Sequence, residues 1–102
     1  MNDVTETDVY IVYIMVLPNG TAVPKVEYDE LRREVEDAIG WLPFGVPCSI
    51  ENLVTPKFWL PKRNRRRRDL GRCLAYWVAK GALPLEFVGP AVRTNKRYRL
   101  RE

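Results

Sequence analysis

Two segments of this sequence place apolar residues at the spacing of an amphipathic helix, and these two stripes constrain the fold more than any other feature. They predict helices over about residues 26–41 and 66–80. Gly81 follows the second stripe, where a left-handed C-terminal cap is expected. The second stripe consists of Leu70, Cys73, Leu74, Trp77 and Val78. A chain of 102 residues has room for one core that buries both stripes, so we expect a single domain over residues 1–102.

Shorter elements are expected between and after these stripes. Ser49 suits the N-cap of a short helix at residues 49–54, and Thr55 with Pro56 resembles a second helix start. Residues 85–89 and 96–101 alternate weakly, which predicts two antiparallel strands joined by a loop. The fold class is therefore predicted to be α+β.

The N-terminal quarter contains a strand signal of a different kind. Val9–Leu17 is a run of β-branched and aromatic residues without alternation, so we expect a strand covered on both faces. It either lies in a sheet with the C-terminal strands or pairs with a second copy of the chain. For a homodimer, the expected contact residues are Val9, Ile11, Tyr13 and Met15. A turn at residues 18–20 and a short returning strand complete an extension over residues 1–24.

The charge of the chain is divided between its two halves. Residues 1–54 hold ten acids and three bases, whereas residues 55–102 hold fourteen bases and three acids, for a formal net charge of +4. Six of the bases fall within residues 62–68, directly before the second helical stripe. Such a run repels itself unless an anion relieves it, and guanidinium groups match phosphate geometry. We interpret the run as a contact with a nucleic-acid backbone. The alternative is a solvated basic loop.

The candidate nucleic-acid-binding residues lie in this run, on the exposed face of the helix that follows, and in the C-terminal hairpin. They are Lys62, Arg63, Arg65, Arg66, Arg67, Arg68, Arg72, Tyr76, Arg93, Lys96 and Arg97. Tyr76 suits either this surface or the edge of the core. Asp69 is expected to form an ion pair with Arg65 and Arg72 that holds those side chains in place.

Three further residues are interpreted as structural. Trp59 and Trp77 are expected to anchor the core. Gly71 costs about 1 kcal/mol relative to Ala inside a helix, so we expect it to allow close packing against another helix.

The order of elements is typical of a winged helix-turn-helix, in which a short helix, a longer basic helix and a β-hairpin follow one another. In that fold the second helix enters the major groove of DNA, and the hairpin contacts the backbone. We therefore predict a winged-helix core at residues 25–102 with an additional N-terminal β-strand.

Several short motifs resemble those of small winged-helix proteins of bacteria, phages and plasmids, many of which are known only as a domain of unknown function. The motifs are Ser49-Ile50-Glu51-Asn52-Leu53, Phe58-Trp59, Leu70-Gly71-Arg72, Gly81, Phe87-Val88-Gly89 and Thr94-Asn95-Lys96-Arg97-Tyr98. The resemblance covers about residues 46–100 and implies the fold more than any particular activity.

The residue types that the sequence lacks argue against a metal site and against an enzyme. The chain has no histidine, and Cys48 and Cys73 lack CxxC spacing, so we expect no metal, no cofactor and no enzymatic activity. The longest apolar run is about half a membrane span, and no secretory signal precedes the cysteines, so we expect a soluble cytoplasmic protein without a disulfide. The leading hypothesis is a small transcriptional regulator that binds duplex DNA. The alternative is a phage-type inhibitor, such as an anti-CRISPR or anti-restriction factor, that binds a protein partner.

Overall fold

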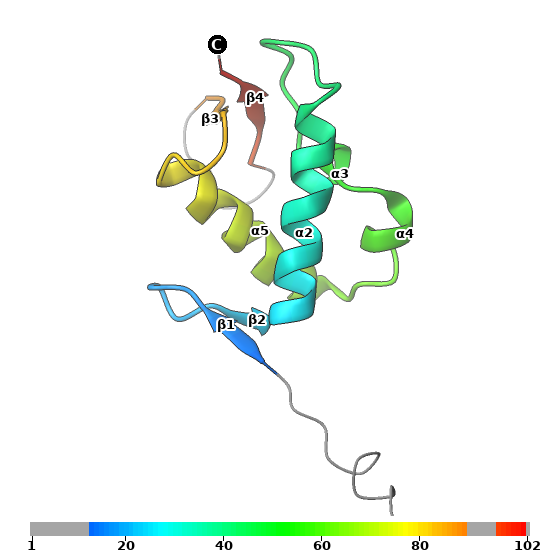
Figure 1. The fold of residues 1–102 in the computed structure, drawn as a ribbon, viewed down its shortest axis with the longest axis vertical. Coiled ribbons are helices and arrows are strands. Elements are labelled where there is room, and N and C mark those ends of the chain that lie inside the picture. The colour runs from blue at the N-terminus through cyan, green and yellow to red at the C-terminus, as the bar shows by residue number, and fades with distance from the viewer. Residues whose placement is uncertain (1–12, 90–95, 102) are drawn as a thin grey trace, which may run out of the picture.

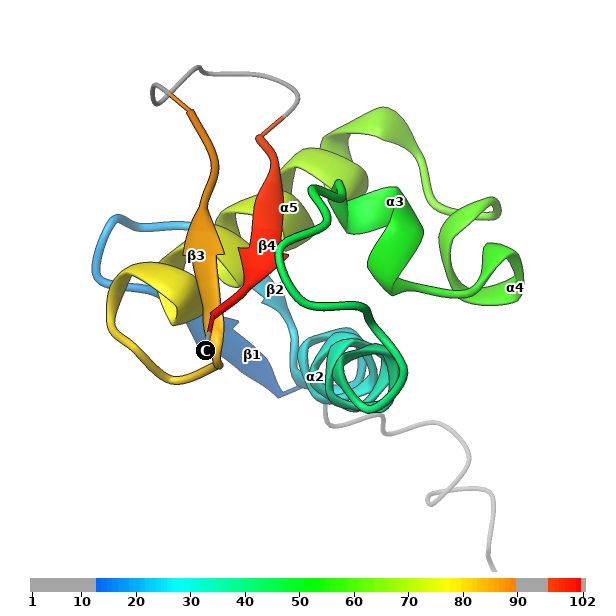
Figure 2. The same ribbon diagram turned by 90° about the horizontal axis from the view of Figure 1, so that it is seen from above.

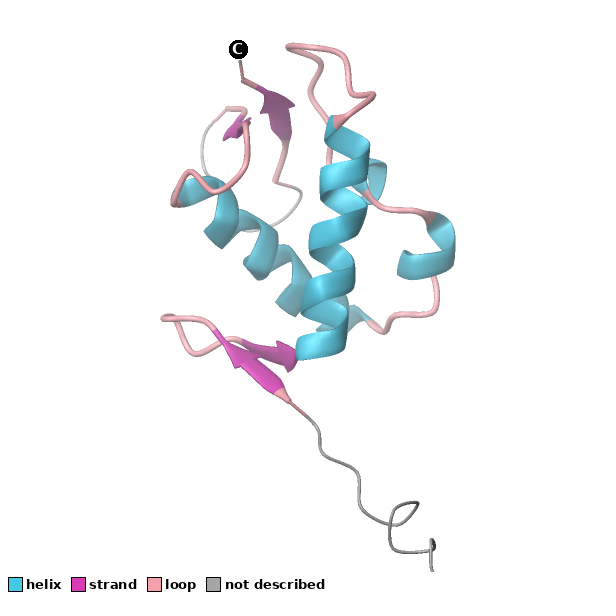
Figure 3. Ribbon diagram, in the orientation of Figure 1, coloured by secondary structure: helices cyan, strands magenta, loops and turns pink. Residues whose placement is uncertain are grey.

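The two amphipathic stripes form the two long helices of the structure, a computed structural model that describes residues 13–89 and 96–101. Helix α2 spans Lys25–Ile39 and helix α5 spans Asn64–Ala79 (Figure 1). Each buries its stripe, and α5 is followed by Gly81 with φ of +78°, in the left-handed region. Both predicted helices are confirmed, with ends that differ by up to two residues. The described residues form an α+β fold with two small antiparallel sheets (Figure 3).

Two single-turn helices connect α2 to α5, and both begin at residues that the sequence indicates. Helix α3 spans Ile50–Leu53, and the backbone N–H of Ser49 donates to Oδ1 of Asn52 at 2.9 Å. Helix α4 spans Pro56–Trp59, where the N–H of Phe58 donates to the Thr55 hydroxyl oxygen at 3.3 Å. These contacts satisfy N–H groups that have no partner within so short a helix.

The C-terminal strands pair as predicted, although they are shorter. Strand β3 (Leu85–Phe87) runs antiparallel to β4 (Tyr98–Leu100), with Glu86 opposite Arg99. On the other side of β4, Cys48 and Tyr98 exchange two backbone hydrogen bonds of 2.7 Å. This bridge ties the loop before α3 to the hairpin, so α3 and β4 are held as neighbours (Figure 2).

The N-terminal strand pairs with the short returning strand that follows it, as predicted, and the expected alternative of a sheet with the C-terminal strands is wrong. In the described residues, β1 (Ile14–Val16) pairs only with β2 (Ala22–Pro24). Gly20 makes the turn with φ of +90°, a conformation that side chains rarely adopt. Strand β2 packs against both α2 and α5, so the hairpin closes one end of the helix pair.

The expectation that both faces of this strand are covered is also wrong for the part of it that the structure describes. Leu17 is buried and Met15 is half-buried, whereas Tyr13, Ile14 and Val16 are 57–65% exposed. The pleat explains the exposure of Ile14 and Val16, because alternate side chains point to opposite faces and only one face meets the helices. Tyr13 has the parity of Met15 and Leu17 and lies one residue before β1. The predicted dimer residues Val9 and Ile11 lie outside the described residues.

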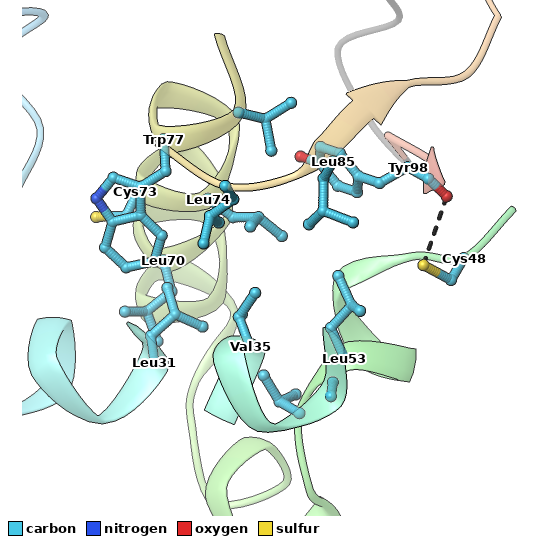
Figure 4. Packing of buried hydrophobic residues seen from close by; sticks show 14 of the residues in the cluster. Leu31, Val35, Cys48, Leu53, Leu70, Cys73, Leu74, Trp77, Leu85 and Tyr98 are labelled. Carbon is cyan, nitrogen blue, oxygen red and sulfur yellow. Dashed lines mark hydrogen bonds between the residues drawn. The ribbon is translucent and has the colours of Figure 1, made fainter. Parts of the chain in front are cut away.

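The core lies between the two long helices, α3 and the C-terminal hairpin (Figure 4). Trp77 and Trp59 are 1% and 6% exposed, which confirms both as core residues. The Nε1–H of Trp77 donates to the Tyr28 hydroxyl at 3.0 Å, so α2 and α5 share a polar contact beside their apolar one. Cys48 and Cys73 are free and buried. Within residues 13–89 and 96–101, no helix has the length and apolar content needed to cross a membrane.

Candidate nucleic-acid interface

The basic run lies at the N-terminal end of α5. Arg63 is the N-cap residue, and the first turn of the helix contains no acid. A helix N-terminus has unpaired N–H groups and a partial positive charge, so cations there are unfavourable unless an anion is near. The local sequence therefore builds a positive end on α5 that is suited to an anionic partner.

Three cations of the run are held by the chain itself. Arg66 forms a 2.8 Å ion pair with Glu27 of α2, so the acidic helix neutralises part of the run. Arg67 donates to the carbonyl oxygen of Leu60 at 3.0 Å. Lys62 Nζ lies 4.3 Å from the ring centroid of Phe58, a cation–π contact. These contacts position the start of α5 against α2 and α4.

The other three cations remain available. Arg63, Arg65 and Arg68 are exposed and form no ion pair or hydrogen bond with another side chain among the described residues. Further along α5, Arg72 is 57% exposed and forms the expected pair with Asp69 at 3.2 Å, whereas the expected pair of Asp69 with Arg65 is not formed among the described residues. Because exposed pairs of this kind stabilise by about 0–1 kcal/mol, Arg72 can exchange this partner for a phosphate at little cost.

A groove of about 610 Å³ runs between α3, the first half of α5 and β4, and we call it the α3–β4 groove. Trp59 and Tyr98 lie in it and are almost completely buried, so they belong to its floor. Glu51 is the only acid among the described residues that line it. The lining residues are Ser49, Ile50, Glu51, Trp59, Asn64, Arg67, Arg68, Gly71, Arg72, Lys96 and Tyr98.

Gly71 opens into this groove, and the expectation that it allows close helix packing is wrong. A Cβ atom built at Gly71 meets no heavy atom within 4 Å. Gly71 is on the side of α5 that faces the groove, whereas the apolar stripe faces the neighbouring helix. Because Gly71 has no side chain, it leaves space in the groove, and it does not bring two helices closer together.

The structure brings together some of the predicted site residues and separates others. Arg67, Arg68, Arg72 and Lys96 line the α3–β4 groove, although they come from two distant segments. Tyr76 instead packs at the edge of the core, with Lys80 Nζ 5.1 Å from its ring centroid. Arg97 is exposed and lies outside the lining of this groove, and Arg93 lies outside the described residues.

Buried groups near the site are held in their neutral forms. Burial raises the pKa of the Cys73 thiol to about 11, and the charge of Asp69 adds to this shift. Burial also raises the pKa of Cys48, whereas the nearby positive charge of Arg97 opposes it. Neutral thiols are poor nucleophiles and poor metal ligands. Within the part of the chain that the structure describes, no three or more acidic or cysteine side chains gather where a metal could bind.

Sequence reasoning missed several lining residues. From the sequence, Ser49 was predicted only to cap a helix. Asn64 was predicted only to be part of the basic run. Nothing in the local pattern indicates that α3 and β4 meet beside α5, because that contact joins segments about fifty residues apart.

Comparison of the chain with family models, with curated proteins and with solved structures finds no match in any of the three. The charges and the geometry of this chain are therefore the features from which its function can be inferred.

Proposed function

We propose that this protein is a non-enzymatic DNA-binding protein, a small regulator that places α5 in the major groove of duplex DNA. The observation that supports this most strongly is the α3–β4 groove. There, Arg68 and Arg72 of α5 and Lys96 before β4 converge, with one acid among the residues around them. Three cations around one groove repel one another, and a bound polyanion would relieve this repulsion.

The proposal includes the winged helix-turn-helix arrangement. Helices α3 and α4 precede α5, and the β3–β4 hairpin follows it, which is the order of that fold. In this arrangement α5 is the recognition helix and the hairpin is the wing. The bridge between Cys48 and Tyr98 ties the loop before α3 to the hairpin, which supports this proposal.

The exposed ridge of α5 supplies the side chains for recognition. Arg65, Arg68 and Arg72 recur at spacings of three and four residues, so they share one face of the helix. A guanidinium group reads guanine by a bidentate contact to its base edge, whereas a contact to phosphate carries no sequence information. The ridge is long enough to make contacts of both kinds.

A binding assay over a salt series tests the proposal. Fluorescence anisotropy of the purified protein with duplex DNA should give a slope of log affinity against log salt of roughly −4 to −6, at about −0.9 per neutralised phosphate. Arg68→Ala should cost about 1–3 kcal/mol at a preferred site and weaken its sequence preference. Arg33→Ala is the matched control, because Arg33 is exposed on α2 and does not line the α3–β4 groove. Absence of measurable binding to any duplex at low salt would refute the proposal.

One observation favours a second candidate, a phage-type inhibitor that binds a protein of a host nucleic-acid machine. The loop between α2 and α3 exposes Trp41, Phe44 and Val46, by 65%, 64% and 48%. Aromatic side chains exposed together are typical of protein-binding surfaces. If the protein inhibits a CRISPR or restriction nuclease without binding DNA, and Trp41→Ser abolishes that inhibition, this candidate replaces the first.

A further inference from the structure

A second groove, of about 710 Å³, lies on the other side of the α5 ridge, and we call it the turn groove. Its walls are α5 and the turn between β1 and β2, and this turn has no role in the function proposed above. The residues that line it are Asn19, Gly20, Thr21, Ala22, Arg65, Arg68, Asp69 and Arg72. Three guanidinium groups and one carboxylate leave this groove with an excess of positive charge.

Hydrogen bonds within the β1–β2 turn hold it in one conformation. The N–H of Leu17 donates to the carbonyl oxygen of Thr21 at 2.8 Å, and the N–H of Gly20 donates to that of Leu17 at 2.9 Å. The N–H of Thr21 donates to Oδ1 of Asn19 at 2.9 Å. The side-chain amide of Asn19 keeps its N–H donors for another partner. A binding wall held by its own hydrogen bonds loses little entropy when a ligand arrives.

A threonine side chain also lines this groove. Thr21 is 9% exposed, and its hydroxyl forms no hydrogen bond with another described residue. Its oxygen is not among the fully buried side-chain atoms that lack a partner, which in the described residues are Glu27 Oε1 and Arg67 Nε. A hydroxyl that lines a groove with three arginines suits an oxyanion, because hydroxyl and guanidinium groups both donate to phosphate oxygens.

We infer that the turn groove binds a phosphate group of the nucleic-acid backbone, and that the β1–β2 turn is a phosphate clamp. This inference rests on the proposed function. Hydroxyl, amide and guanidinium donors are the groups that most often contact phosphate oxygens. A recognition helix in the major groove has a sugar–phosphate strand on each side. Lys96 faces one strand across the α3–β4 groove, and Thr21 faces the other across the turn groove.

The test compares three proteins with one duplex DNA by fluorescence anisotropy. Thr21→Val keeps the shape of the side chain but removes the donor, and it should weaken binding about 10-fold, as expected for a hydrogen bond to a charged group. Thr21→Ser keeps the hydroxyl and should bind within about 2-fold of the parent protein. Because threonine is neutral, Thr21→Val should leave the salt slope unchanged, whereas Arg65→Ala should flatten it by about 0.9. Thermal unfolding of each variant confirms that it is folded.

The outcomes separate this inference from the proposed function. If the parent protein binds duplex DNA and Thr21→Val binds equally well, the phosphate clamp is refuted while the proposed function stands. If the parent protein binds no nucleic acid, the proposed function fails, and the assignment of this groove to the nucleic-acid backbone fails with it. Titration with inorganic phosphate, followed by the amide resonances of residues 19–22, tests whether the turn groove binds free phosphate instead of a backbone phosphate. Saturable shifts of these resonances, together with unchanged DNA binding by Thr21→Val, would also overturn the assignment to the nucleic-acid backbone.

Discussion

Replacing Gly71 by alanine gives the sharpest test of the geometry described for α5. Gly71 lies in the interior of a 16-residue helix, where glycine is less favourable than alanine by about 0.8–1.0 kcal/mol. The new methyl group meets no heavy atom within 4 Å, so no steric cost offsets this gain. We therefore expect Gly71→Ala to raise the free energy of unfolding by about 1 kcal/mol.

The measurement is thermal unfolding followed by circular dichroism, with urea unfolding as a second reading. A gain of this size should raise Tm by about 4–8 °C in a domain of this length. Gly81→Ala is the matched control, since its site is equally open but has φ of +78°. That conformation costs a non-glycine residue about 1–2 kcal/mol, so this variant should unfold at a lower temperature.

A loss of stability in Gly71→Ala would refute the reasoning, because it would mean that α5 packs closely against a neighbour at this position. The same variant also reports on the groove. Gly71 lines the α3–β4 groove, so a larger side chain, as in Gly71→Leu, should weaken DNA binding while the helix stays folded. Tighter or equal binding by a folded Gly71→Leu protein would show that the groove does not receive the ligand.

Three other predictions follow from particular contacts. If the exposed face of β1 pairs with a second copy, sedimentation velocity should show a dimer that Ile14→Lys converts to a monomer, and a monomeric parent protein would contradict this. Glu27→Gln should lower the free energy of unfolding by no more than about 1 kcal/mol in urea titrations, because its ion pair with Arg66 is partly exposed to solvent. The folded state raises the pKa of Cys73 from 9.0 to about 11 and that of Tyr98 from 10.0 to about 12. Both groups bind protons more tightly when folded, so their contribution to stability should be fully present below pH 9 and be lost as pH rises from 9 to 12. A rise in Tm between pH 9 and 12 would contradict the assignment.

Local sequence patterns determined most of the secondary structure. The apolar spacing of Leu70, Leu74 and Trp77 predicts α5, and Thr55 with Pro56 predicts the start of α4. These signals are local because helix faces and caps depend on residues only three or four positions apart. The position of the basic run before α5 was likewise visible in the sequence.

Only the tertiary structure decided which residues meet. The sequence does not indicate that Arg66 is neutralised by Glu27, that Gly71 opens into a groove, or that the β1–β2 turn lies beside the α5 ridge. The strand signal of the N-terminal run was correct for β1, and the short returning strand after the turn is β2, but the expected sheet with the C-terminal strands does not form. A run of apolar residues records a preference for an extended backbone, whereas the partner strand and the covered face depend on how distant segments pack. The sequence therefore sets the charges of the candidate interface, and the contacts that α2, α3 and both hairpins make with α5 set their grouping around two grooves.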